Sequence, residues 1–423
     1  MRDREIVRKD MEELYLGNLG TVEFDLELPE SGKHGSRISW HSDNLNFMDH
    51  SGRVSRPAYG RGNREVTMTA CFRYGEYEEE KSYLVTVLEE NNRIEVAKIY
   101  PIRKQAVKGE NVCLPSAVAV KTKDNRVIAH FVEWDGGLVR CWEQPGNYEV
   151  YGRLKDTKIP VNGIVEVREE KQAVSPVRKV VMSCADNTKL LPGSDFYDAQ
   201  ERVHSYLLHT REDQWLYNFR RAAGLPVGGA SPMTGWDSPE GLLRGHSTGH
   251  YLSALALCYQ TSGDEEILKK AVYMVDSLGE CQEAFGQKEG YHKGFLSAYS
   301  EEQFDLLEKY TPYPKIWAPY YTLHKILAGL IDLYKLAGIR KAGKIAEEIG
   351  EWVYGRLNAL THEQRVKMWS IYIAGEYGGM NESMAELFRI TGKKEFLEAA
   401  RFFDNDRLFY PLEQGVDALD GMH

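Results

Sequence analysis

The chain has 423 residues, of which 42% are hydrophobic and 27% charged, a composition typical of folded domains and not of disordered chains. This length predicts two or three domains. The net charge of -10 disfavours a basic binding face, so neither a nucleic acid nor a membrane is expected as a partner.

The N-terminus and the cysteines bear on where the protein works. The first ten residues contain no apolar run, and no stretch approaches the roughly 18 consecutive apolar residues of a membrane helix. A cytoplasmic location is therefore expected, or an extracellular one if a signal peptide has been removed. The cysteines are scattered without a C-x-x-C pair, which predicts free thiols and no metal site. They are Cys71, Cys113, Cys141, Cys184, Cys258 and Cys281.

Residues 1–20 are predicted to form either a short acidic helix or a frayed leader. From residue 21 to 90, apolar and polar residues alternate in short runs separated by turn residues, the pattern of a β module. The predicted strands of this first module are 21–28, 65–72 and 83–88.

A second β module is predicted over 111–169. Its predicted strands are 117–120, 128–134, 148–151 and 163–167. The segments Ile38-Ser39-Trp40 and 52–57 in the first module resemble bacterial immunoglobulin-like domains, as do Leu114-Pro115, 132–135 and 145–148 in the second. The resemblance implies two β-sandwich modules with a spacer or accessory role.

Beyond a linker at about 170–187, the apolar period becomes helical. Three apolar helices each end at a glycine, namely Gly263, Gly338 and Gly392, and each is followed by a charged amphipathic helix. The pattern predicts helical hairpins capped by these glycines, stacked as a solenoid or a closed α/α toroid over 189–423. The predicted fold class is therefore two β-sandwich modules followed by an all-α domain.

The candidate site residues lie just before these apolar helices. Counted back from the capping glycines, His250, His324 and Glu382 fall at similar positions, so parallel helices would bring them to one end of the domain. Aromatic, imidazole and carboxylate side chains together suit the binding of a sugar. The candidates are Trp236, Arg244, His246, His250, Trp317, Tyr320, Tyr321, His324, Glu376, Glu382 and the C-terminal His423.

Structural roles are open for each candidate. His246 and His250 are four residues apart, so they could cap a helix or ligate zinc, although no glutamate lies between them as in H-E-x-x-H. Trp317, Tyr320 and Tyr321 suit a core as well as a sugar platform. Asn381 could cap the next helix, and the glycine pair at 378–379 allows close backbone approach.

From about 189 to 423 the chain resembles glycoside hydrolase family 127, the β-L-arabinofuranosidase family. The matching motifs are Leu243-Arg244-Gly245-His246, 249–254, Glu280-Cys281-Gln282, 317–321, 323–330 and 376–382. The resemblance implies an (α/α)6 barrel that cleaves terminal L-arabinofuranose, or a related sugar, with retention. It also implies that His246 or His250, His324 and His423 bind the sugar.

In that family the cysteine nucleophile, the acid/base glutamate and the zinc site lie C-terminal to the segment that matches 421–423. The catalytic residues are thus expected beyond His423, with zinc implied for the full-length family and no cofactor in this chain. The expectation is an N-terminal part of a retaining glycosidase that is inactive alone, whose partners are an arabinose-containing oligosaccharide or glycoside and a complementing C-terminal chain. The alternatives are a non-catalytic carbohydrate-binding remnant and a helical-repeat interaction protein.

Overall fold

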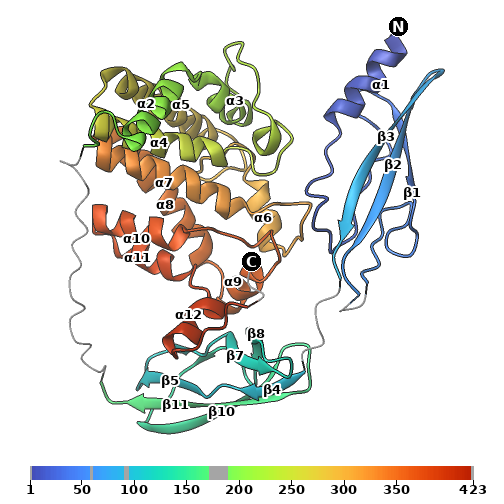
Figure 1. Ribbon diagram of the computed structural model, residues 1–423. Helices are drawn as coiled ribbons and strands as arrows, with labels where there is room; N and C mark the ends of the chain where they lie inside the picture. The colour runs from blue at the N-terminus through green and yellow to red at the C-terminus, as the bar shows by residue number, and fades with distance from the viewer. Residues whose placement is uncertain (1, 58–60, 90–94, 171–188, 421–423) are drawn as a thin grey trace.

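The computed structural model describes the whole chain except residues 1, 58–60, 90–94, 171–188 and 421–423. A β-rich N-terminal part is followed by a helical C-terminal part (Figure 1). Among the described helices, none is both long and apolar enough to cross a membrane.

The N-terminal module consists of one helix on a small antiparallel sheet. Its elements are α1 (Arg2–Glu13), β1 (Arg37–Ser42), β2 (Arg64–Tyr74) and β3 (Tyr77–Val87), with strand order β1-β2-β3. Val7 of α1, inside the segment predicted as a short helix or a frayed leader, is buried together with Ile38, Ala70 and Phe72 of the sheet. The predicted strands at 65–72 and 83–88 correspond to β2 and β3.

The predicted strand at 21–28 is wrong. Only Val22 forms a bridge, to Val87, and the rest of the segment runs outside any sheet. Val22 and Leu26 are nevertheless buried while Phe24 is exposed. The alternation of apolar and polar residues therefore indicates which side of the segment faces the core. An extended chain can have two such sides without pairing as a strand.

The second module is built on one six-stranded sheet of order β4-β7-β8-β10-β11-β5, in which only β11 and β5 run parallel. Two of its strands, β4 and β5, precede residue 111, and the four predicted strands are confirmed as β7, β8, β10 and β11. A separate two-stranded ladder joins β6 to β9. The bounds are β4 (Val96–Ile99), β5 (Ile102–Val107), β6 (Val112–Cys113), β7 (Ala117–Thr122), β8 (Val127–Trp134), β9 (Val139–Arg140), β10 (Gly146–Leu154) and β11 (Pro160–Arg168).

The C-terminal part is helical throughout its described length. Its elements are α2 (Asp195–His209), α3 (Glu212–Ala223), η1 (Gly235–Asp237), α4 (His246–Ser262), α5 (Glu265–Gly286), α6 (Glu302–Glu308), α7 (Pro319–Ala337), α8 (Arg340–Asn358), α9 (His362–Trp369), α10 (Met380–Thr391), α11 (Lys394–Arg401) and α12 (Asp406–Glu413).

The predicted hairpins are confirmed as α4–α5, α7–α8 and α10–α11. The first helix of each ends at Gly263, Gly338 or Gly392, whose φ angles of 68°, 69° and 75° need a residue without a Cβ. The inner helices α4, α7 and α10 lie next to one another, and α5, α8 and α11 form an outer layer (Figure 1).

The inner helices α4 and α7 approach unusually closely at two glycines. A Cβ on Gly249 would lie 2.1 Å from the carbonyl carbon of Lys325, and one on Gly329 would lie 2.4 Å from the carbonyl oxygen of Gly249. Backbone therefore touches backbone across this interface. The contact places the first turn of α4 directly beside the second and third turns of α7.

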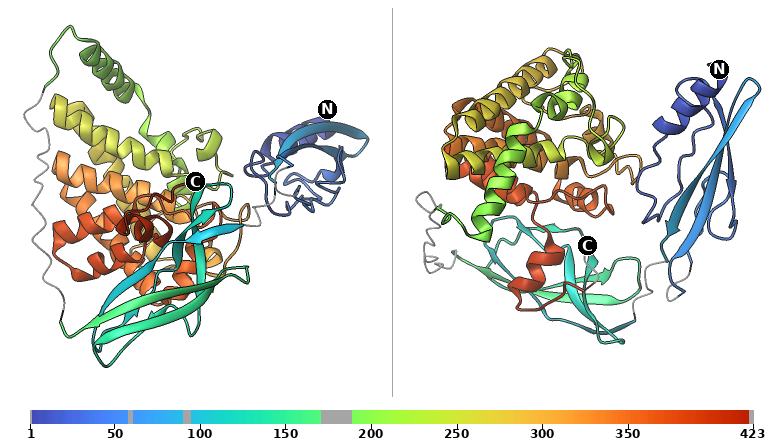
Figure 2. Two further views of the ribbon diagram at one scale, coloured as in Figure 1. Left: turned by 60° about the horizontal axis from the view of Figure 1, so that its bottom comes forward. Right: turned by 45° about the horizontal axis from the view of Figure 1, so that its top comes forward.

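The second β module docks on the helical part through α12, which packs against β7 and β8 (Figure 2). Tyr410 of α12 is buried in the core of the module, and its hydroxyl donates to the carbonyl of Arg103 and accepts from the Arg103 N–H. The Asp406 carboxylate accepts from both the backbone N–H and the hydroxyl of Ser116, each at 2.8 Å.

Candidate functional site

Six of the predicted residues meet where the N-termini of α4 and α7 lie side by side, and we call them the histidine cluster. They are Trp236, His246, His250, Trp317, Tyr321 and His324. Ring contacts join five of them, with centroid distances of 5.7 Å from Trp236 to His246, 6.1 Å from Trp236 to Trp317, 6.2 Å from His246 to His250 and 6.4 Å from His246 to Tyr321. His324 lies close enough to His250 for the charge of that ring to lower its pKa. The prediction that His250 and His324 share one end of the domain is confirmed, and Glu382 lies at the same end, in the first turn of α10.

His246 is the first residue of α4 and is buried. Its Nδ1–H donates to the carbonyl of Leu243 at 2.9 Å and lies 3.4 Å from Oδ2 of the buried Asp237. The other oxygen of Asp237 accepts from the Gly245 N–H at 2.7 Å. Asp237 thus fixes both the ring and the start of the helix, so His246 is a rigid wall of the cluster.

His324 is half-buried against the loop before α10. Its Nδ1 accepts from the Gly379 N–H at 3.2 Å, and a Cβ on Gly379 would lie 3.0 Å from His324 Nε2 and 3.6 Å from Glu382 Oε2. Burial, together with the charges of Lys325 and His250, lowers the pKa of His324 to about 4. The ring is therefore neutral at pH 7 with its proton on Nε2, a donor suited to a hydroxyl group.

Lys325 is a member of this neighbourhood that the sequence analysis did not select. Its ammonium lies 4.7 Å from the centroid of the Tyr321 ring, and burial lowers its pKa. Burial and then the charge of Lys325 lower the pKa of the exposed His250 as well. The available signal was its place directly after His324, because a nearby cation lowers the pKa of an imidazole.

The aromatic members provide the flat surfaces. Trp236 is 59% exposed, and its ring stands edge-on to that of Trp317 at 6.1 Å. Trp317 precedes Ala318, whose φ of 42° is strained for a residue with a Cβ by about 1 kcal/mol. Strained backbone of this kind gathers at ligand-binding positions.

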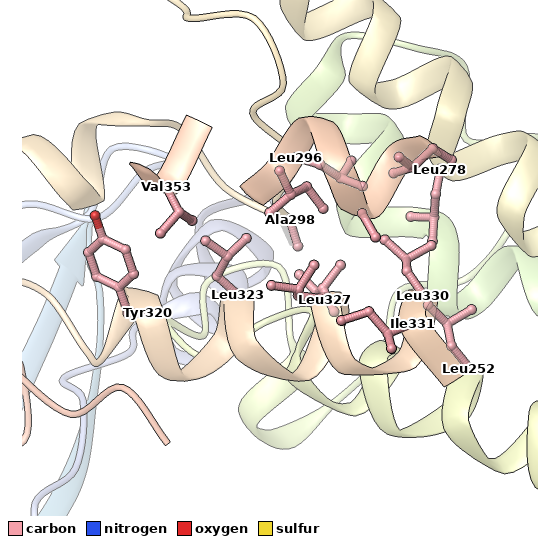
Figure 3. Packing of buried hydrophobic residues seen from close by; sticks show 14 of the residues in the cluster. Leu252, Leu278, Leu296, Ala298, Tyr320, Leu323, Leu327, Leu330, Ile331 and Val353 are labelled. Atoms are coloured by element: carbon pink, nitrogen blue, oxygen red, sulfur yellow. The ribbon is translucent and has the colours of Figure 1, made fainter. Parts of the chain in front are cut away.

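The structure does not bring every candidate to this surface. Tyr320 is fully buried on the core side of α7, on the same face as Leu323 and Leu327 (Figure 3). Arg244 donates to the carbonyls of Gly241 and Ala298, both at 2.9 Å. Hence Tyr320 is a core residue and Arg244 ties the loop before α4 to the loop at Ala298.

Glu376 influences Tyr372, in the loop before α10, through its charge. Burial and the charges of Glu23 and Glu376 raise the pKa of Tyr372. His423 lies outside the described residues, as does Cys184. In the first turn of α10, Asn381 is not the capping residue, because Gly379 occupies the N-cap position.

The cluster offers hydrogen-bond donors, one carboxylate and exposed rings. No set of three or more His, Cys, Asp or Glu side chains among the described residues could hold a metal ion, so the zinc implied by the resemblance finds no matching ligands there. Burial raises the pKa of Cys281 to about 12 and of Cys71 to about 11, and also raises those of Cys113 and Cys258. These four thiols are protonated at neutral pH and are therefore poor nucleophiles.

An open groove of about 950 Å³ lies elsewhere, between the outer helices α5 and α8. Its walls carry Glu280, Glu283, Glu348, Lys293 and Lys344 and no aromatic ring. None of the predicted residues that the structure describes lines it. A sugar needs a flat apolar face as well as polar groups, so the histidine cluster is the better candidate.

The C-terminal part is thus a domain of stacked helical hairpins with a polar, ring-bearing site at the N-termini of its inner helices. Residues 187–423, more than half of the chain, match the model of the β-L-arabinofuranosidase catalytic domain of glycoside hydrolase family 127. The chain belongs to glycoside hydrolase family 127. Residues 7–90 match the model of the atrophied bacterial Ig domain, so the N-terminal module is Ig-like.

Two solved structures show weaker likenesses. A family 127 β-L-arabinofuranosidase from Geobacillus stearothermophilus T6 is 16% identical over 52% of this chain and 34% of its own, with a TM-score of 0.34. A polysaccharide lyase is 11% identical over 88% of this chain and 68% of its own, with a TM-score of 0.23. The chain thus spans about a third of the length of that arabinofuranosidase. No curated protein matches the sequence.

Proposed function

We propose that the histidine cluster binds the terminal L-arabinofuranosyl unit of a glycoside, as the sugar-holding part of a family 127 glycoside hydrolase. The observation that carries the proposal is the meeting of neutral imidazoles with the exposed Trp236 and the partly buried Trp317 at the N-termini of α4 and α7 in a domain of this family. Among the eleven candidates, His324 is the central residue, with His246, His250, Trp236, Trp317, Tyr321 and Glu382 around it.

The roles of the groups follow from their protonation and position. The Nε2–H of His324 donates to a ring hydroxyl, and the carboxylate of Glu382 at the same level accepts from one. A neutral, buried donor discriminates well, since an analogue that lacks its hydroxyl partner would leave it unpaired. The indole of Trp236 takes the apolar face of the sugar ring.

The described residues favour sugar holding over bond cleavage. Glycoside hydrolysis needs a proton donor and a nucleophile or an activated water, and the described thiols with shifted pKa values are all held protonated. We therefore assign binding to this cluster. Non-catalytic carbohydrate binding is the second candidate function. It is favoured because protonated thiols are poor nucleophiles for cleaving a glycosidic bond.

For the whole chain we propose an Ig-like module up to residue 90, a second β module that ends at 169 and a helical domain from 189. The packing of Val7 on the first sheet supports counting the segment 1–20 with the first module. The stacked hairpins are consistent with part of an (α/α)6 toroid. An Ig-like origin for the six-stranded module is part of this proposal.

The test is calorimetric titration with methyl β-L-arabinofuranoside at pH 7. We expect His324→Ala to weaken binding about tenfold, because one hydrogen bond to a buried donor contributes about 1.4 kcal/mol. His209→Ala, at the exposed end of α2, is the matched control and should bind as the unmodified chain does.

An unmodified chain that binds no arabinoside would contradict the proposal. Release of 4-nitrophenol from an aryl β-L-arabinofuranoside would show instead that the chain cleaves the bond itself, which would exclude the non-catalytic alternative. Binding without release is the expected result.

A further inference from the structure

The N-terminal module lies against the loops that carry the histidine cluster. We propose that this Ig-like module forms the outer wall of the sugar site, where Tyr15 contacts the sugar unit that follows the terminal arabinofuranose. The inference rests on the proposed function and names the part of the ligand that lies beyond the cluster. Its support comes from the contacts between the module and the helical part.

The module touches the loops that precede all three inner helices. Before α4, the Lys33 ammonium lies 2.9 Å from Oε1 of Glu240. Before α7, the Lys315 ammonium lies 2.5 Å from Oε1 of Glu27. Before α10, Thr21 hydrogen bonds to Tyr372. The module therefore lies at the same end of the helical part as the cluster.

Gly17, in the segment between α1 and β1, also packs against the helical part. A Cβ on Gly17 would lie 3.1 Å from Cβ of Pro314 and 3.3 Å from the hydroxyl of Tyr313. Both residues belong to the loop that leads into Trp317. The space for this contact exists only because residue 17 has no side chain, and its φ of 82° also requires glycine.

A chain of aromatic rings leads from this contact into the cluster. The ring of Tyr313 stands edge-on to Trp317 at 5.6 Å, and Trp317 stands edge-on to Trp236 at 6.1 Å. Such edge-to-face pairs prefer a defined geometry. Docking of the module thus helps to hold Trp317, and through it Trp236, in place.

Tyr15 is the module's aromatic residue at this seam. It is 38% exposed, it lies two residues before Gly17, and its phenol is close enough to Tyr313 to influence that residue electrostatically. Because the module touches the loops before α4, α7 and α10, which carry the cluster, we place the substituent of a sugar held at His324 and Trp236 on the module's side. An exposed tyrosine there offers a face for a second sugar ring.

Two probes separate the inner and outer parts of the site. One is methyl β-L-arabinofuranoside, which fills only the cluster, and the other is a disaccharide with a β-L-arabinofuranosyl unit at its non-reducing end. We expect the full chain to bind the disaccharide more tightly. Tyr15→Ala should lower the disaccharide affinity about fivefold and leave the methyl glycoside affinity unchanged.

The matched control is Tyr74→Ala, since Tyr74 belongs to the same module and is 36% exposed, at the far end of β2. It should change neither affinity. Gly17→Ala should lower the disaccharide affinity at least as much as Tyr15→Ala. Its control is Gly62→Ala, which has a φ of 71° but meets only the end of Arg64, at 3.7 Å.

Urea unfolding of both glycine variants shows whether the module still folds. Unchanged disaccharide affinity in Tyr15→Ala, or an equal loss for both probes, would overturn the inference while the proposed function stands. An unmodified chain that binds the methyl glycoside and the disaccharide equally would overturn it too. If the chain binds neither probe, the proposed function fails, and the inference fails with it.

Discussion

The two β modules attach to the helical part in opposite ways. The second module buries Tyr410 of α12 in its own core and satisfies Asp406 with two hydrogen bonds. The N-terminal module instead uses loop contacts, such as that of Gly17 with Tyr313, and solvent-accessible ion pairs, such as Lys33 with Glu240, whose side chains are 54% and 37% exposed. A buried interface stabilises the fold, whereas an exposed one beside the histidine cluster can be adjusted with little effect on folding.

The largest expected effect is at the buried interface. Tyr410→Ala removes a buried aromatic ring and two hydrogen bonds, so we expect it to lower the free energy of unfolding by about 3 kcal/mol. Urea denaturation measures the change. Phe409→Ala is the control, because the neighbouring Phe409 is 42% exposed. If Tyr410→Ala and Phe409→Ala lowered the free energy of unfolding equally, burial of Tyr410 in the second module would not be what stabilises this interface.

A smaller effect is expected from pH. The pKa of His324 is about 4 in the folded chain and near 6.5 when unfolded, so below pH 6.5 the unfolded state takes up the proton first. Stability is therefore fully present above pH 6.5 and should fall by up to about 2 kcal/mol as the pH drops toward 4.

The measurement for this pH effect is urea unfolding at several pH values. His324→Gln should flatten the profile between pH 6.5 and 4, and His209→Gln should not. A profile unchanged by His324→Gln would place the titrating group elsewhere, for example at His362 near the second module, whose pKa burial also lowers.

The smallest effect is expected at the exposed interface. Lys33→Ala removes one solvent-accessible ion pair and should change the free energy of unfolding by less than about 1 kcal/mol. The change should vanish in 1 M salt, where screening removes the interaction. A loss as large as that of Tyr410→Ala would mean that the two modules are attached alike.

Local patterns predicted much of the helical part. Gly263, Gly338 and Gly392 cap their helices as expected, because a left-handed C-cap depends on the residue at that position alone. The repeat then placed His250 and His324 at one end. Their neutrality was not predictable, since it depends on burial and on Lys325 in three dimensions.

Tertiary packing decided the rest. Residues 21–28 alternate like a strand, yet strand pairing needs a partner that no local pattern specifies. Tyr320 and Tyr321 are neighbours in the sequence, but the turn of α7 buries the first and leaves the second beside His246. The contact of Gly17 with Pro314 joins residues almost 300 positions apart, which no motif spacing indicates.

The backbone contact between Gly249 and Gly329 has a consequence for ligand binding. Two helices that touch without intervening side chains cannot slide past each other, so the amides around this contact should be among the slowest to exchange with deuterium. The rings at the first turns of α4 and α7 are then preorganised before any sugar arrives. These side chains therefore lose little conformational entropy when a sugar binds. Such preorganisation raises the affinity of a shallow binding surface.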